Sequence, residues 1–220
     1  MNNPRLTVGA VMYPGFEMLD MFGPLEMFAM LGTDLVQIRT VAETSEPIAT
    51  AITQDLNSGP KVLADCTFDS AEQFDLVLVP GGFGTLPQLD NDVFLAFLRQ
   101  QAEGAKYVCS VCTGSLLLAR AGLLAGRRAT TNKQLFALTA AESADVSWIE
   151  KARWVEDGPI FTSSGVSAGM DMSLALICEI FGEEAALAAA NAAEYTWHRN
   201  ADEDPFLEHL NEAAKLMGLV

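Results

Sequence analysis

The clearest candidate for chemistry is Cys112, in the segment VCTGS at residues 111–115, where an apolar run passes into a helical pattern with almost no loop. A residue at such a junction lies at the carboxyl end of a strand, where ligands bind in open α/β sheets. The free N–H groups of the next helix are expected to stabilise a thiolate and lower the pKa of the cysteine. The small residues that follow fit a nucleophile elbow. The alternative is a buried cysteine that serves only as a small hydrophobic residue.

Cys109 and Cys112 also form a C-x-x-C spacing, which is typical of redox pairs when both cysteines lie in the first turn of a helix. Cys109, however, lies three residues back inside the expected strand. At about 3.3 Å per residue, the two Cα atoms would lie roughly 10 Å apart, too far for a disulfide. The spacing therefore argues against a redox pair.

Two other features lie near strand ends. Gly81 and Gly82 follow an apolar run, and their N–H groups, with that of Thr113, are candidates to stabilise negative charge, although a plain turn explains the glycines equally well. Asp20 interrupts the apolar segment MLDMFG. Because a lone ionised carboxylate is costly to bury, Asp20 is either a solvated helix cap or a functional acid with a raised pKa.

Histidine chemistry has little support in this chain. His198 and His209 are its two histidines, and both lie in the acidic C-terminal segment. No Cys-His dyad can be assembled from nearby sequence, which argues against amide hydrolysis. A histidine-based metal cage is equally unexpected.

The elements that must position these residues alternate between strands and helices. Nearly continuous apolar runs predict buried parallel strands at 6–12, 74–82 and 106–111, and alternation predicts another at 34–43. Helices are expected at 92–104, 113–124 and 167–182, and a turn at Gly23-Pro24 is expected to precede a helix that ends near 31. Hairpins are predicted at 47–65 and at 146–165, the second turning at Asp157-Gly158, and residues 183–216 are expected to be helical with a break near 202–205.

Composition narrows the class of protein. The chain has 220 residues, with 13 Lys and Arg against 29 Asp and Glu, so its formal charge is −16. Phosphate backbones and anionic lipid surfaces repel such a chain, which argues against nucleic-acid and membrane partners. No signal peptide or apolar stretch of membrane-spanning length is evident, so we expect a cytoplasmic protein. The length and the absence of a linker predict one α/β domain over residues 1–220, with a mainly parallel sheet covered by helices on both faces.

The segments LDMFGP, LVLVPGG, SVCTGSLLLARAGLLAGRRATT and SGVSAGMDMSLAL resemble the ThiJ/PfpI superfamily, which has a class I glutamine amidotransferase-like fold. The resemblance spans residues 5 to 206 and is strongest to the isocyanide (isonitrile) hydratase branch. It implies a flavodoxin-like three-layer sandwich, a homodimer, and no metal or organic cofactor. The same domain is also found fused to DNA-binding modules in transcriptional regulators.

The resemblance also implies roles for individual residues. The nucleophile falls on Cys112, its acidic partner on Asp20, and the neighbouring hydroxyl on Thr113. The oxyanion-type amides fall on Gly82 and Thr113, and a flexible segment near the substrate falls on Gly165-Val166. One departure concerns Asn132, which stands where many relatives have a histidine near the pocket rim.

The reaction that the resemblance implies is hydration of an isocyanide to an N-substituted formamide. The Cys112 thiolate would attack the terminal carbon while a protonated Asp20 donates its proton, and the Asp20 carboxylate would then activate water to release the product. Another possibility is a glyoxalase-like or deglycase-like enzyme that acts on reactive aldehydes. A redox sensor in which Cys112 is oxidised without turnover, or a ligand-binding regulator, would be a protein of a different class.

Overall fold

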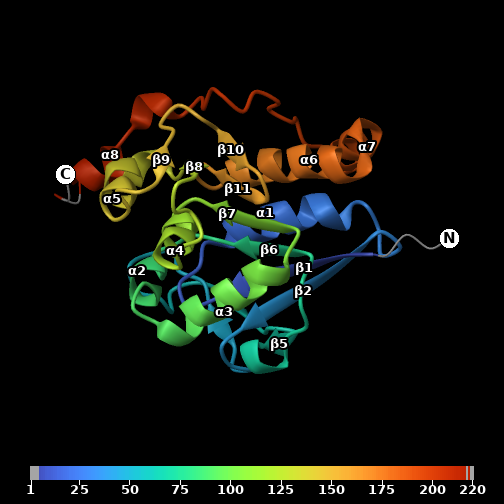
Figure 1. The fold of residues 1–220 in the computed structure, drawn as a ribbon, viewed down its shortest axis with the longest axis horizontal. Coiled ribbons are helices and arrows are strands. Elements are labelled where there is room, and N and C mark those ends of the chain that lie inside the picture. Colours follow the sequence, from blue (N-terminus) through green and yellow to red (C-terminus); the bar gives the residue numbers. More distant parts are fainter. Residues whose placement is uncertain (1–4, 217, 219–220) are drawn as a thin grey trace.

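A seven-stranded sheet forms the centre of the protein, whose computed structural model describes residues 5–216 and 218 (Figure 1). Its strand order is β10-β11-β7-β6-β1-β2-β5, and each neighbouring pair is parallel except β10 with β11. The strands are β1 (Leu6–Met12), β2 (Val36–Ala42), β5 (Cys66–Thr67), β6 (Leu76–Val79), β7 (Tyr107–Val111), β10 (Trp154–Asp157) and β11 (Ile160–Ser163). The predicted mainly parallel α/β sheet is confirmed.

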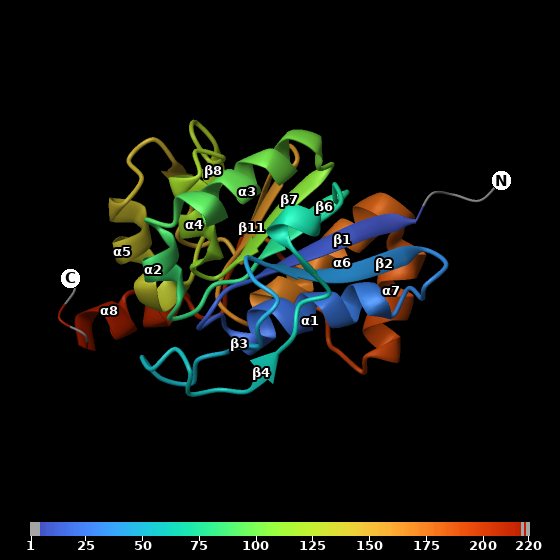
Figure 2. The same ribbon diagram turned by 90° about the horizontal axis from the view of Figure 1, so that it is seen from below.

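Helices cover both faces of this sheet, which explains why β1, β6 and β7 are apolar on both sides. Figures 1 and 2 show α1 (Met18–Ala29), α6 (Ala168–Phe181) and α7 (Glu183–Ala192) on one face, and α3 (Asp92–Gly104) with α4 (Gly114–Arg120) on the other. The result is the predicted three-layer arrangement. Shorter elements are α2 (Thr85–Gln88), α5 (Phe136–Ala141), α8 (Glu212–Leu216), and the 3₁₀ turns η1 (Phe68–Ser70), η2 (Lys133–Leu135) and η3 (Leu207–His209).

Helix α1 is continuous through Gly23 and Pro24, so the turn predicted there is wrong. Pro24 removes one helical N–H donor, but it is buried together with Gly23 where α1 packs against α6. A Cβ at Gly23 would lie 3.0 Å from Cγ of Met170, and a Cβ at Gly169 would lie 3.0 Å from Cγ of Pro24. Close packing of the two helices therefore outweighs the local preference for a break.

The hairpin predicted at 47–65 is confirmed, because β3 (Ile48–Ala49) pairs antiparallel with β4 (Lys61–Val62). The hairpin at 146–165 is narrower than predicted. Its arms are β10 and β11, and the turn is at Gly158-Pro159, one residue later than predicted, because Asp157 pairs with Ile160. In contrast, β9 (Ser147–Trp148) pairs in parallel with β8 (Arg128–Ala129). No helix within the described residues is both long enough and apolar enough to cross a membrane.

The C-terminal region is less helical than predicted, because α7 ends at Ala192 and residues 193–206 form no helix. Buried side chains hold this segment instead. The carboxylate of Asp171 in α6 accepts hydrogen bonds from the Tyr195 hydroxyl at 3.0 Å and the His198 N–H at 2.8 Å. Its other oxygen lies 2.8 Å from Nη2 of the buried Arg153, which also faces Asp204 at 3.6 Å. These contacts replace the helical hydrogen bonds that the sequence pattern suggested.

Candidate active site

Cys112 lies in the sharp turn between β7 and α4, as predicted, and its φ of 58° places it in the left-handed region. Hydrogen bonds on both sides hold this unfavourable backbone. The Cys112 N–H donates to Ser164 O at 3.0 Å, and the Cys112 carbonyl accepts from the hydroxyls of Ser115 and Thr131, each at 3.0 Å. A Cβ at Gly114 would collide with the carbonyl of Val79, which explains the small residue after the turn. Strain of this kind concentrates at functional sites.

Asp20 lies in the first turn of α1 and is fully buried. Its Oδ2 accepts a hydrogen bond from Gly81 N at 2.9 Å, while Oδ1 has no partner among the described residues. Burial raises the pKa of Asp20 to about 7, and the charge of Glu17 also raises it, while the Gly81 N–H, followed by the Cys112 thiol and the Val166 amide, acts to lower it. The buried carboxyl group can therefore hold or release a proton near neutral pH.

Cys112 is only 7% exposed. Burial, followed by the charge of Asp20, raises the pKa of this thiol well above its usual value, although the Thr113 N–H and the Asn132 side chain act in the lowering direction. The predicted lowering of the Cys112 pKa is therefore wrong, because the N–H groups at the start of α4 are outweighed by desolvation and a neighbouring carboxylate. Two groups that interact this strongly exchange protons as a pair.

Gly81, Gly82 and Thr113 connect these groups through hydrogen bonds. While Gly81 N holds Asp20, Gly82 N donates to Oγ1 of Thr113 at 3.1 Å. The Thr113 hydroxyl also lies 2.9 Å from that of Thr85, which in turn lies 3.2 Å from the hydroxyl of Tyr13. Sequence reasoning missed Thr85 and Tyr13. Tyr13 directly follows the carboxyl end of β1, which was the available signal.

Gly165 and Val166 also lie at the site, one residue beyond the end of β11. Val166 has a φ of 48°, a rare conformation for a β-branched residue. A Cβ at Gly165 would lie 2.5 Å from Nδ2 of Asn132, and this nitrogen donates a hydrogen bond to Cys112 Sγ at 3.1 Å. Asn132 was noted in the sequence as a missing histidine, but the structure brings it into contact with the candidate nucleophile.

A cavity of about 670 Å³ opens above the sulfur, and we call it the Cys112 pocket. Its polar lining includes Cys112, Thr113 and Asn132, together with Glu17 and Gln54. The remaining walls are mostly apolar and come largely from α2, α4, α5 and the loops beside them: Leu56, Phe83, Leu86, Pro87, Leu116, Leu135, Leu138 and Val166. A mostly apolar pocket with a few convergent polar groups is typical of small-molecule sites.

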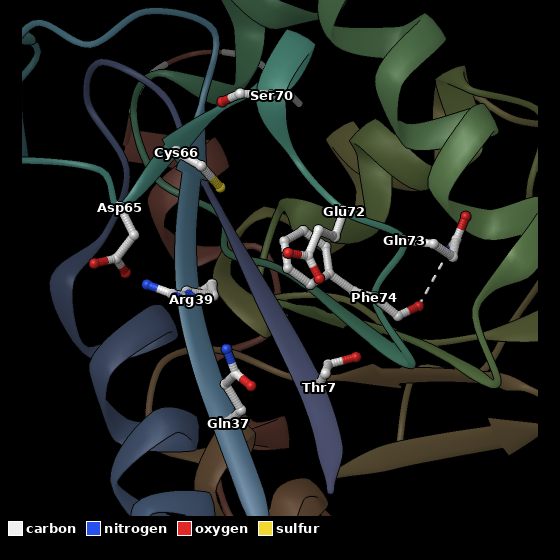
Figure 3. A pocket seen from close by; sticks show the side chains of 9 residues that line it. All are labelled: Thr7, Gln37, Arg39, Asp65, Cys66, Ser70, Glu72, Gln73 and Phe74. Carbon is white, nitrogen blue, oxygen red and sulfur yellow. Dashed lines mark hydrogen bonds between the residues drawn. The ribbon is translucent and has the colours of Figure 1, made fainter. Parts of the chain in front are cut away.

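A second, smaller pocket of about 170 Å³ lies over the edge of the sheet formed by β1, β2 and β5, and we call it the edge pocket (Figure 3). Its lining is largely polar: Thr7, Gln37, Arg39, Asp65, Cys66, Ser70, Glu72, Gln73 and Phe74. In the part of the chain that the structure describes, no three His, Cys, Asp or Glu side chains gather closely enough to hold a metal ion.

Residues 7–179 match the sequence profile of the DJ-1/PfpI family. The chain belongs to this family. An isonitrile hydratase from Pseudomonas putida is 36% identical over 190 residues, which cover 86% of this chain and 78% of that protein. The HTH-type transcriptional regulator GbdR from Pseudomonas aeruginosa is 28% identical over 202 residues, which cover 90% of this chain and 53% of the regulator.

Solved structures agree with this assignment to the DJ-1/PfpI family. A ThiJ/PfpI family protein from Pseudomonas syringae matches with a TM-score of 0.79 and 27% identity, covering 98% of this chain and 87% of that one. The likenesses thus extend from a hydratase to a transcriptional regulator. Fold membership alone does not fix the reaction, which depends on the groups at the site.

Proposed function

We propose that this DJ-1/PfpI protein hydrates isocyanides, R–N≡C, to N-substituted formamides. The observation that carries the proposal is the buried pair of Asp20 and Cys112 beside a mostly apolar pocket, since an isocyanide is a small, neutral electrophile that needs a nucleophile and a proton. The similarity to an isonitrile hydratase supports the same reaction. No histidine is required.

In the first half of the reaction, Cys112 Sγ attacks the terminal carbon of the isocyanide as a thiolate. For this attack the thiol proton first passes to Asp20, which neutralises the carboxylate whose charge opposes thiolate formation. Asp20 then delivers this proton to the carbon that is attacked. The product is a covalent thioimidate, R–N=CH–S–Cys112, with Asp20 left as a carboxylate.

In the second half, the Asp20 carboxylate takes a proton from water as the water oxygen adds to the thioimidate carbon. Asp20 passes this proton to the substrate nitrogen, which gives a tetrahedral intermediate. The C–S bond then breaks as the hydroxyl proton returns to Asp20 and the C=O bond forms. The formamide leaves, and the thiolate and the protonated acid are restored, so the net reaction consumes one water.

The other predicted site residues position this pair. Gly81 N holds one oxygen of Asp20, and Gly82 N fixes the Thr113 hydroxyl. The Thr113 N–H faces the sulfur, where it can stabilise the thiolate each time it forms. The Val166 amide faces Asp20, and Gly165 lies against Asn132. We expect the protein to act on this small-molecule substrate in the cytoplasm and to form a homodimer. Sedimentation velocity would test the oligomeric state.

The direct test is to mix the purified protein with an aryl isocyanide and follow formamide formation by ultraviolet absorbance and mass spectrometry. We expect turnover in the wild type, none above background in Cys112→Ala, and undiminished turnover in the control Cys66→Ala. Turnover that persists in Cys112→Ala would contradict the mechanism. A wild-type protein without turnover would contradict the hydratase function, and methylglyoxal would then be the substrate to test.

A further inference from the structure

The side-chain amide of Asn132 has a fixed orientation toward Cys112. Its Oδ1 caps the turn η2 by accepting hydrogen bonds from Gln134 N at 2.8 Å and Leu135 N at 3.2 Å. Because the oxygen is occupied by two N–H donors, the group that faces the sulfur must be the NH₂. This nitrogen lies 3.1 Å from Cys112 Sγ.

The space for this amide depends on the missing side chain at Gly165. A Cβ there would lie 2.5 Å from Nδ2 and 3.3 Å from Cγ of Asn132. Gly165 is not among the glycines with positive φ, so its backbone conformation is open to other residues. Glycine at this position therefore serves the close approach of Asn132 to the sulfur.

We propose that Asn132 is a further catalytic residue, whose amide donates a permanent hydrogen bond to the Cys112 sulfur, and that Gly165 keeps the amide in place. This inference rests on the proposed function in that Cys112 is the nucleophile. The bond would stabilise the thiolate before attack and again when the C–S bond breaks. A histidine at this position could also donate, but it would titrate near neutral pH, whereas an amide does not.

The ionisable groups around Cys112 do not stabilise its thiolate, so a neutral donor is needed for that role. Asp20 faces the thiol from α1, Tyr13 faces it from the end of β1, and ionisation of either group opposes a thiolate. Glu17 lines the same pocket. Lys133, which directly follows Asn132, instead donates to Thr130 Oγ1 at 2.8 Å and Ala152 O at 2.6 Å.

Two variants separate the contact with sulfur from the capping of η2. Asn132→Ser keeps a good capping residue, since serine caps helical turns as well as asparagine, but it removes the amide. Gly165→Ala keeps every polar group and displaces the amide. The readout is the pH dependence of Cys112 alkylation by iodoacetamide, measured on its peptide by mass spectrometry, with Cys66 of the same sample as the internal reference.

We expect each variant to slow Cys112 alkylation at neutral pH by about tenfold and to raise its apparent pKa by about one unit, the size typical of a hydrogen bond to a charged group. The double variant should match either single variant, because both remove the same contact. Thermal unfolding of each variant reports on a purely structural effect.

An unchanged pH profile in Asn132→Ser would overturn the proposal, and so would additive effects in the double variant. Alkylation requires no isocyanide, so a wild type that fails to hydrate isocyanides contradicts the proposed function and leaves this test intact. Where hydration does occur, both single variants should lower kcat more than they change KM.

Discussion

Carboxylates at the two ends of the central sheet have pKa values shifted in opposite directions. Asp75, at the amino ends of β6 and β1, accepts hydrogen bonds from the N–H and the hydroxyl of Thr7 at 2.9 and 3.0 Å and pairs with Lys106 Nζ at 2.9 Å. Burial alone would raise its pKa, but these partners outweigh burial and lower it. Asp20, at the carboxyl ends, has one N–H partner and a pKa raised to about 7.

The cysteines of the two pockets also have different surroundings. Cys66 in the edge pocket is half-buried, and its pKa is raised by burial and by Asp65, while Arg39 acts in the lowering direction (Figure 3). Its thiol makes only a long contact of 3.7 Å with Thr40 O. Cys112 instead has a buried acid and an oriented amide beside it. The two thiols therefore differ in kind: Cys66 is partly exposed beside a cation, whereas Cys112 is desolvated beside a group that can share its proton.

The largest effect should come from exchanging the two carboxylates for amides in turn. Asp20→Asn removes the proton carrier, so kcat for isocyanide hydration should fall by about 10² to 10⁴, the usual contribution of a general acid or base. Asp75→Asn should change kcat by less than about twofold, because it lies outside the pocket. Initial rates with the aryl isocyanide give kcat for both variants. Equal losses of kcat would contradict a functional difference between the two ends of the sheet.

The pH dependence of stability should also differ between the two ends. The Asp20 carboxyl group binds its proton more tightly in the folded state, so its contribution to stability is present at low pH and is lost as the pH rises from about 4 to about 7. The loss should reach about 4 kcal/mol. Urea unfolding of the wild type and Asp20→Asn across this pH range isolates the contribution of Asp20. If the free energy of unfolding depended on pH in the same way in both proteins, the Asp20 pKa would not be raised.

The smallest effect concerns Asp75, whose contribution has the opposite sign. Its pKa is lowered by folding, so its stabilisation is present at neutral pH and is lost as the pH falls below about 4. Asp75→Asn should reduce the free energy of unfolding at neutral pH by about 1 kcal/mol, since the site is partly exposed to solvent. Urea unfolding of the wild type and Asp75→Asn, at neutral pH and below about pH 4, measures this difference. A difference in the free energy of unfolding that persisted in acid would refute the prediction.

Sequence alone predicted the layers of the fold and the Cys112 turn, because both depend on local patterns. Apolar runs identified β1, β6 and β7 as buried strands, and the abrupt change of period after β7 identified the turn. Asp20 could be singled out as an acid in apolar surroundings, but its pairing with Cys112 was implied only by resemblance. The direct contact between Gly81 N and Asp20 spans 61 residues, which no local pattern can reveal.

The predictions that were wrong share a physical cause, since each depended on contacts between distant segments. Packing against α6 keeps α1 continuous through Pro24, and Asp171 holds residues 193–206 away from a helical conformation. The direction of the Cys112 pKa shift depends on how completely the fold excludes water, which spacing does not record. From the sequence, Asn132 indicated only the loss of a histidine, because its distance from the Cys112 sulfur was unknown.

The backbone of Cys112 has a consequence for how this protein can change over time. Glycine adopts a φ of 58° freely, whereas cysteine there costs about 1 to 2 kcal/mol. Glycine at this position would remove that backbone cost, so under the proposed function it is selection for turnover that would keep the cysteine in place. A lineage released from that selection should drift toward glycine at this position, so a homologue with glycine there would mark a pseudoenzyme.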